Sequence, residues 1–265
     1  MKTNLKLGIP SMIELTTVEE SLALCKEFGL SFVELNNNFP QYQPNALDAE
    51  ELIRLSRESG VTYTFHFDDN MSIADFNPYV AEGYVQTVLD VIALAKQVGI
   101  PVLNMHLFKG ACYTMPEKRI FFFEAYEEAY LKNIRSFRDR CQEAIGDSGI
   151  MICVENTDGF TEFQKKGLEI LLESPVFGLT LDIGHNHCAG YLDEPFYKKH
   201  IHRLHHMHIH DCAAGKKDHQ ALGTGELDLQ KYLALAEEHN CTVVLETKTV
   251  EGLRQSVEWL KGKAL

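Results

Sequence analysis

Short apolar segments alternate along the chain with longer segments of helical periodicity, and eight such pairs follow one another. The short segments have the length and branched side chains of strands, and we expect strands over 5–11, 32–36, 62–68, 102–108, 151–157, 178–185, 205–211 and 242–248. The amphipathic segments predict helices over 17–28, 47–59, 78–98, 117–145, 163–173, 194–203, 229–239 and 250–262. Gly29, Gly60, Gly99 and Asn240 stand where a left-handed residue commonly ends a helix.

This alternation of strand and helix predicts a parallel sheet with right-handed crossovers. Eight units in 265 residues fit a closed (β/α)8 TIM barrel better than an open doubly wound sheet. No Gly/Ser/Pro-rich linker or shift in composition interrupts the pattern, so we interpret residues 1–265 as a single domain. The first expected strand is not followed by the glycine-rich G-x-G-x-x-G sequence, which argues against a dinucleotide-binding fold.

The polar residues of the expected strands keep a common phase. Side chains alternate between the two faces of a strand, so Phe65 shares a face with Tyr63, and His66 shares the other with Thr64. The apolar face must meet the surrounding helices, and the polar face therefore points into the barrel. In almost every expected strand the titratable residue lies near the C-terminal end, where enzymes of this fold place their active sites. Several carboxylates and imidazoles should therefore converge at one mouth.

Composition narrows the classes of partner and compartment. With 38 Asp+Glu against 25 Lys+Arg, the net charge is −13, which works against non-specific binding to nucleic acid. The seven cysteines are odd in number and widely spaced, and they include no C-x-x-C pair. This usage favours reduced thiols over a disulfide framework or a thiolate zinc site. With no apolar segment of membrane-spanning length and no visible signal peptide, the sequence predicts a soluble cytoplasmic protein that does not bind a membrane.

Four residues form the strongest candidate for a metal site: Glu155, Asp182, His208 and Glu246, from the last four expected strands. Three carboxylates crowded into a barrel mouth would repel one another unless they were protonated or neutralised by a cation. One divalent ion answers both problems, and this ligand set suits Mn²⁺, Zn²⁺, Mg²⁺ or Co²⁺. The alternative is a set of separate ion pairs, but few Lys or Arg residues occupy inward positions. Spacing alone leaves open whether His206, His208 or His210 is the ligand.

Further residues are candidates for contact with a substrate. His66, His106 and His185 lie at strand ends in the same mouth and could bind substrate or additional metal. His219 lies in a loop rich in Gly and Lys, where a role in the site and exposure to solvent are equally plausible. Glu34 either supports a ligand, contacts substrate or makes structural hydrogen bonds. The same reasoning makes Lys109, which follows the fourth expected strand, a candidate for substrate binding, with a solvated side chain as the alternative.

Five sequence motifs together resemble the xylose isomerase-like barrel superfamily: VENTDGF (154–160), LDIGHNHCAGY (181–191), HIHD (208–211), DHQALGTGELD (218–228) and VVLET (243–247). This superfamily contains sugar isomerases and epimerases together with metal-dependent apurinic endonucleases, and the resemblance extends over essentially the whole chain. It implies that Glu155, Asp182, His208 and Glu246 are metal ligands and that His185 binds substrate.

The resemblance also implies a reaction. A divalent-metal-dependent isomerase or epimerase would act on a small keto sugar or sugar-like molecule, with or without a phosphate. Glu155 and Glu246 would be the catalytic pair, passing a proton through an enediolate. Return of the proton to the opposite face of the same carbon is epimerisation, and return to the neighbouring carbon is isomerisation. Homo-oligomers are the default for soluble enzymes, and the sequence leaves the oligomeric state open.

The alternative within the same superfamily is an apurinic endonuclease that repairs DNA. Its trinuclear zinc site is matched at His66, His106, Glu155, Asp182, His185, His208, His219 and Glu246. However, Lys217 stands where that pattern has an aspartate, and Asp68 and Asp69 would repel phosphate. We therefore favour the isomerase or epimerase. A lyase or dehydratase acting on sugar acids stays open as a further possibility, as does a barrel that binds a ligand without catalysis.

Overall fold

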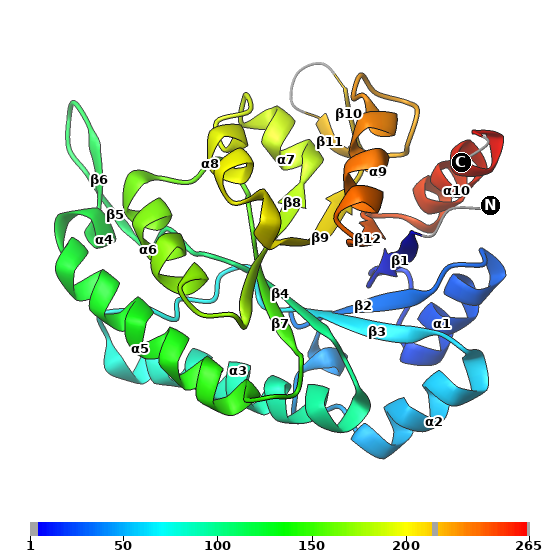
Figure 1. The fold of residues 1–265 in the computed structure, drawn as a ribbon, viewed down its shortest axis with the longest axis horizontal. Helices are drawn as coiled ribbons and strands as arrows, with labels where there is room; N and C mark the ends of the chain where they lie inside the picture. Colours follow the sequence, from blue (N-terminus) through cyan, green and yellow to red (C-terminus); the bar gives the residue numbers. More distant parts are fainter. Residues whose placement is uncertain (1–4, 214–216, 264–265) are drawn as a thin grey trace.

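Eight parallel strands close into a barrel in the order β1-β12-β9-β8-β7-β4-β3-β2 (Figure 1). The computed structural model describes residues 5–213 and 217–263. Within it the barrel strands are β1 (Lys6–Pro10), β2 (Phe32–Asn36), β3 (Thr62–His66), β4 (Val102–His106), β7 (Met151–Glu155), β8 (Phe177–Asp182), β9 (Leu204–Ile209) and β12 (Thr242–Leu245). The closed sheet and its surrounding helices confirm the predicted (β/α)8 TIM barrel.

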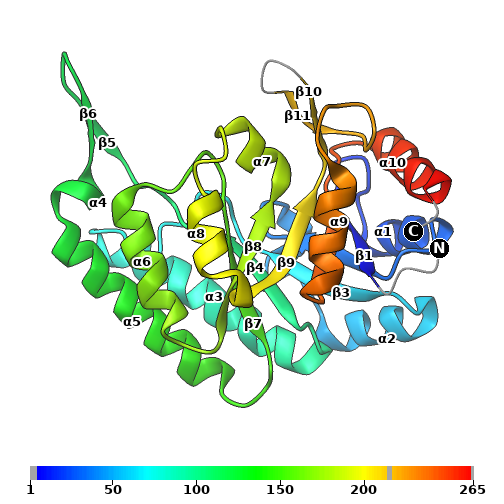
Figure 2. The ribbon, with the colours of Figure 1, turned by 45° about the horizontal axis from the view of Figure 1, so that its top comes forward.

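Helices surround the barrel (Figures 1 and 2). They are α1 (Val18–Glu27), α2 (Ala49–Ser59), α3 (Pro78–Val98), α4 (Phe122–Ala125), α5 (Glu127–Ile145), α6 (Glu162–Leu172), α7 (Ile183–Cys188), α8 (Glu194–Lys199), α9 (Leu229–Glu238) and α10 (Val250–Gly262), with short 3-10 turns at Pro40–Tyr42 and Ile201–Arg203. None of the helices in 5–213 and 217–263 combines the length and the apolar character that a membrane span requires.

The helix ends follow the signals in the sequence. Thr17 begins α1 with a capping box, in which its side chain accepts the N–H of Glu20 and the Glu20 side chain accepts backbone N–H groups in return. Gly60 and Gly99 end α2 and α3 with φ angles of 77° and 85°, and Asn240, after α9, has a φ of 52°. These values confirm the left-handed helix ends that we expected.

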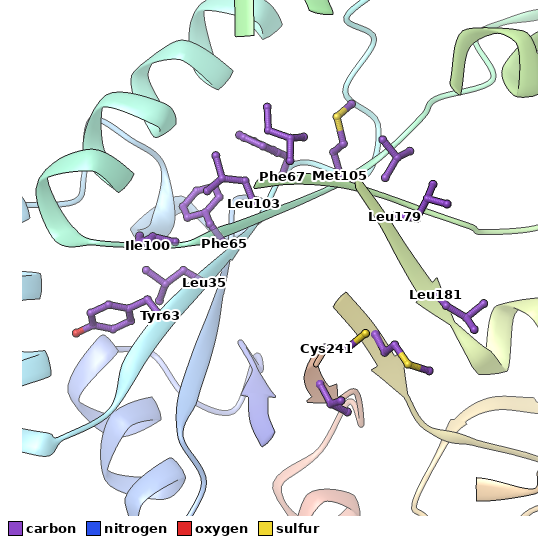
Figure 3. Packing of buried hydrophobic residues seen from close by; sticks show 14 of the residues in the cluster. Leu35, Tyr63, Phe65, Phe67, Ile100, Leu103, Met105, Leu179, Leu181 and Cys241 are labelled. Carbon is purple, nitrogen blue, oxygen red and sulfur yellow. The ribbon is translucent and has the colours of Figure 1, made fainter. Parts of the chain in front are cut away.

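The expected separation of apolar and polar strand faces is also confirmed. Leu35, Phe65 and Leu103 come from the neighbouring strands β2, β3 and β4, and their buried side chains lie together in the apolar core (Figure 3). Inside the barrel, the hydroxyl of Thr180 donates to the side-chain oxygen of Asn104 at 2.6 Å. The barrel interior beneath the mouth is therefore lined by hydrogen-bonded polar side chains.

Two predicted strands end earlier in the structure than we expected. The strand expected over 178–185 stops at Asp182, because the Oδ1 atom of Asp182 accepts the N–H of His185 at 2.7 Å and so begins helix α7. The strand expected over 205–211 stops at Ile209. Asp211 instead begins β10 (Asp211–Ala213), which pairs in antiparallel orientation with β11 (Lys217–Gln220).

The helix expected over 117–145 begins later in the structure than we expected. Residues in its first turns form β6 (Arg119–Phe121), which pairs with β5 (Cys112–Thr114) in a hairpin. The hairpin projects from the body of the molecule (Figure 2). Its turn is closed by the N–H of Met115, which donates to the carbonyl of Lys118 at 2.9 Å, and Pro116 lies inside that turn. The helical periodicity of the segment becomes real only from α4 and α5 onward.

Candidate active site and metal centre

Four side chains from the ends of four strands meet at the mouth of the barrel. Glu155 ends β7, Asp182 ends β8, His208 lies in β9, and Glu246 directly follows β12. The strand register aligns Asp182 with His208 and Val244 with His208, which brings these elements to one level. One ligand atom from each of the four side chains lies within 4.8 Å of the others, and all four residues are less than 10% exposed. The fold thus brings together the four residues that we expected to bind a metal.

The imidazole of His208 lies at the centre of this cluster. Its Nδ1 atom is 3.3 Å from Oε2 of Glu155 and 3.3 Å from Oε2 of Glu246. Neither Nδ1 of His208 nor Oε2 of Glu246 has a hydrogen-bond partner among the described residues, although both atoms are buried. Buried polar atoms without partners are costly, and a cation between them would satisfy both. Three carboxylates and one imidazole therefore fit a divalent metal ion.

The cluster is strongly coupled by charge. Burial raises the pKa of the Glu155 carboxyl, but His208 and His106 together outweigh burial and hold it well below its usual range. For Glu246, burial is likewise outweighed, here by Lys248 and His208, and the pKa is again lowered. The pKa of His208 is raised well above its usual value, because the surrounding carboxylates outweigh the effect of burial. A proton on His208 thus offsets carboxylate charge, and binding of a metal would release it.

Glu34 lies directly beneath His208. Its Oε1 atom is 3.0 Å from Nε2 of His208, while Oε2 is 3.0 Å from Nε2 of His206 and accepts the hydroxyl of Thr64 at 3.1 Å. Only 2% of Glu34 is exposed. These contacts favour support of His208 over contact with substrate. His206, which also hydrogen-bonds Thr242, has the structural contacts that we expected of it.

His66 and His106 line one side of the mouth. The Nε2 atom of each is 3.4 Å from Oε2 of Glu155, and the two rings are perpendicular with centroids 5.0 Å apart. The Nδ1 atom of His66 is 2.6 Å from the carbonyl oxygen of Phe67, and Nδ1 of His106 is 3.6 Å from a carboxylate oxygen of Asp69. Both histidines therefore lie at the candidate site, as the sequence predicted.

His185 and His219 line the opposite side. The Nδ1 atom of His185 is 3.5 Å from Glu155 and 3.4 Å from Asp182, and Nε2 of His219 is 3.6 Å from Glu246. The two imidazole rings lie with their centroids 5.2 Å apart. Of the two interpretations of His219 left open by the sequence, the structure favours a place at the site.

Lys109 lies at the rim, in the loop after β4, and pairs with the carboxylate of Asp158. Asp158 borders a pocket of about 390 Å³, which is also lined by Thr157, His185, Cys188, Ala189 and Asp218. The charge of Lys109 is therefore already balanced at the edge of this pocket. Its pairing differs from the free substrate contact that we expected, while its location near the mouth agrees.

Sequence reasoning missed His210 as part of the site. Its Nδ1 atom accepts the N–H of His219 at 2.8 Å, which leaves the proton on Nε2. Nε2 lies 3.0 and 3.1 Å from the two carboxylate oxygens of Asp182 and so donates to them. His210 thus orients a candidate metal ligand and the loop that bears His219. Spacing along the strand gave no signal for this, because the chain leaves β9 at Ile209.

Asp211 is the second residue that the sequence analysis missed. Its Oδ1 atom accepts the N–H groups of Cys212 and Leu227, at 2.9 and 3.2 Å, and its Oδ2 atom accepts those of Gly223 and Gly225, at 3.0 and 2.9 Å. A Cβ atom on Gly225 would lie 2.1 Å from the carbonyl oxygen of Cys212, so only glycine fits there. The sequence GTG after a buried aspartate was the available signal for this ordered loop.

A closed parallel barrel with three carboxylates and an imidazole gathered at its mouth defines a TIM barrel with a candidate divalent-metal centre. The family model described as a xylose isomerase-like TIM barrel matches residues 22–263. The chain belongs to this family, as the motifs of its sequence predicted.

Solved structures with the same fold cover nearly the whole chain. A D-tagatose 3-epimerase-like protein is 24% identical, with a TM-score of 0.77 over 97% of this chain and 96% of its own. The 3-keto-D-glucoside 4-epimerase YcjR from E. coli is 15% identical, with a TM-score of 0.78 over 98% of this chain and 100% of its own. The IOLI protein, whose structure contains a binding zinc atom, is 14% identical, with a TM-score of 0.73 over 97% of this chain and 96% of its own.

Proposed function

We propose that this protein is a divalent-metal-dependent enzyme that isomerises or epimerises a keto sugar or a closely related molecule. The observation that carries the proposal is the placement of Glu155 and Glu246 on opposite sides of one buried imidazole nitrogen, each 3.3 Å from Nδ1 of His208. Membership of the xylose isomerase-like family supports it, as do the sugar epimerases among the proteins with the same fold.

Glu155, Asp182, His208 and Glu246 would hold the metal ion. Such an ion supplies Lewis-acid chemistry, which makes a carbon next to a carbonyl group easier to deprotonate. The ligand set suits Mn²⁺, Zn²⁺, Mg²⁺ or Co²⁺, and the zinc atom of the similar IOLI structure supports Zn²⁺ as one of these.

The two glutamates would move the proton. One carboxylate removes a proton from the carbon beside the carbonyl, and the other returns a proton from across the site. The Oε1 atom of Glu246 is held by the ammonium of Lys248 at 2.7 Å and lies 3.6 Å from His219, which keeps this carboxylate in one orientation. Glu155 is held by a hydrogen bond from the side chain of Asn104. Rigid placement of both groups favours transfer to a fixed carbon of the substrate.

The histidines would bind and orient the substrate. The imidazoles of His66, His106, His185 and His219 surround the carboxylates, and neutral or charged imidazoles donate hydrogen bonds to sugar hydroxyls. Whether the sugar bears a phosphate stays open in this proposal. We also propose a cytoplasmic location, which the spacing and odd number of the seven cysteines support.

One observation favours a second candidate function, that of an apurinic endonuclease. The imidazoles of His66 and His106 approach the same oxygen of Glu155, and such a group could hold an additional ion. The exposed Lys217 and the carboxylate of Asp69 weigh against it, because the first would repel a further cation and the second would repel phosphate.

Two measurements test the proposed function. Elemental analysis of the purified protein should find about one divalent ion per chain, whereas about three tightly held zinc ions would favour the endonuclease. Incubation with a panel of ketoses in D2O should introduce deuterium next to the carbonyl. Cleavage of an oligonucleotide with an abasic site would favour repair, and loss of water from sugar acids would favour a dehydratase.

Substitution of the proton-transfer groups gives the sharper test. Glu155→Gln and Glu246→Gln should each fold and lower turnover at least about 100-fold, the usual size of acid–base effects. Glu128→Gln, on the exposed face of α5, is the matched control and should turn over like the wild type. Near-normal rates in both site variants would remove the proposed proton transfer.

A further inference from the structure

Two cysteines meet at the edge of the candidate site. The Sγ atoms of Cys188, the last residue of α7, and Cys212, in β10, are 3.9 Å apart. Cys188 is partly exposed and lines the pocket of about 390 Å³ beside His185, whereas Cys212 is buried. Helix α7 lies beside β10 and β11 (Figures 1 and 2). We propose that Cys188 and Cys212 form a reversible disulfide in response to peroxide, a redox site that joins α7 to β10.

The distance between the sulfurs supports this pairing. A disulfide bond is about 2.05 Å long, so the sulfurs must approach by about 1.9 Å, shared between two side chains. In the reduced state, Cys212 donates a weak hydrogen bond to the carbonyl oxygen of Gly184 at 3.5 Å. That contact already directs the Cys212 sulfur toward the helix that contains Cys188.

The surroundings of the two thiols assign them different roles. Burial and the neighbouring Cys188 raise the pKa of Cys212, so Cys212 stays protonated and does not meet the oxidant. Cys188 is open to the pocket and reacts first. Its sulfur bonds to one oxygen of hydrogen peroxide, the O–O bond breaks, and the products are a sulfenic acid on Cys188 and one water.

The second step joins the two sulfurs. The sulfur of Cys212 attacks the sulfenic sulfur of Cys188, and the hydroxyl group of the sulfenic acid leaves with the proton of Cys212 as a second water. Two thiols and one peroxide thus give one disulfide and two waters, with the thiols oxidised and the peroxide reduced. A dithiol such as dithiothreitol reverses the bond by exchange.

The bond would act on the site because the contact between α7 and β9–β10 has no slack. A Cβ atom on Gly184 would lie 1.9 Å from the ring of His210, so the backbone of α7 rests directly on that imidazole. A pull on Cys188 is therefore transmitted to His185, one turn earlier in α7, and to His210, which donates to Asp182. A displacement of about 1 Å can cost up to about 100-fold in rate, so we expect turnover to fall about tenfold or more on oxidation; this consequence rests on the proposed function.

The thiol chemistry itself is tested without any substrate. The starting protein is the full chain with Cys112→Ser, because Cys112 in the projecting hairpin is exposed and could join two molecules. Treatment with a small excess of hydrogen peroxide should remove two hydrogen atoms, about 2 Da, and give a linked peptide containing Cys188 and Cys212. Dithiothreitol should restore the original mass, and Cys188→Ser in the same background should not form the link.

Two outcomes would overturn the proposal. One is a peroxide-treated protein in which Cys188 and Cys212 are both still alkylated by iodoacetamide. The other is a sulfenic or sulfinic acid on Cys188 that never joins Cys212. Cys212→Ala is a second variant, but Cys212 is buried, so Cys188→Ser alone suffices if Cys212→Ala does not fold. Linkage without a change in turnover would refute the coupling to the site, while the linkage itself would stand.

Discussion

Glu34→Gln tests whether the carboxylate beneath His208 prepares this imidazole for a metal ion. The substitution keeps the size of the side chain and removes its charge. In the wild-type protein one carboxylate oxygen lies 3.0 Å from Nε2 of His208, and the other is shared by His206 and Thr64. A carboxylate on one imidazole nitrogen makes the other nitrogen, here Nδ1 toward Glu155, a stronger ligand.

The magnitude follows from these contacts. In the variant, the amide oxygen can still accept from His208, but the amide NH₂ then faces His206 and Thr64, which both donate in the wild type. One of these donors must turn or change its proton. Loss of such an outer partner weakens metal binding by about 10- to 100-fold, which is about 1.4–2.8 kcal/mol of binding free energy.

The assay is titration of the metal-free protein with Mn²⁺ or Zn²⁺ in competition with a chelator of known affinity, which needs no substrate. Thr64→Val is the matched control, because it removes the hydroxyl from Glu34 without touching His208, and its affinity should stay within about threefold of the wild type. A folded Glu34→Gln protein that binds both metals as tightly as the wild type would refute the reasoning.

Three further predictions concern packing, the ordered loop and metal removal. Gly184→Ala should lower the free energy of unfolding by about 1–3 kcal/mol, because its methyl group would overlap the ring of His210. Gly83→Ala, in α3 with no neighbour within 4 Å, should instead raise it by about 0.5–1 kcal/mol, and equal thermal melting of the two variants would contradict both estimates. Asp211→Asn leaves one good acceptor for four N–H groups and should cost about 1–3 kcal/mol in urea unfolding; an unchanged midpoint would count against the loop's dependence on Asp211. Metal at 100 times its Kd should raise stability by about 2.7 kcal/mol over the metal-free protein, and a melting temperature independent of metal would contradict a site in the native barrel.

The barrel itself could be predicted because its signals are local and repeated. Strand alternation and helix ends such as Gly60 and Gly99 each depend on a few neighbouring residues, and the structure bears them out. The phase of residues such as Glu155 and Asp182 then follows from the rule that apolar faces meet the helices. This is why the mouth and the convergence of its carboxylates could be foreseen from the sequence.

Details that depend on contacts between distant residues could not be foreseen. The end of β8 is set by the Asp182 side chain, which caps a helix where the alternation continues to suggest a strand. His210 and Asp211 owe their contacts to the place where the chain leaves β9, and no spacing rule gives that place. The pairing of Lys109 with Asp158 joins two loops whose paths are set only by the whole fold.

Asp182 serves two purposes at once, since the carboxylate that faces the candidate metal also starts the helix bearing His185. Removal of this side chain by alanine would therefore unravel the first turn of α7 as well as withdraw a ligand. Its effect could not be assigned to either cause. Asparagine is an equally good first residue for a helix but has no charge. Asp182→Asn is thus the substitution that separates the ligand from the architecture, and it shows how closely this barrel combines local folding with the placement of its reactive groups.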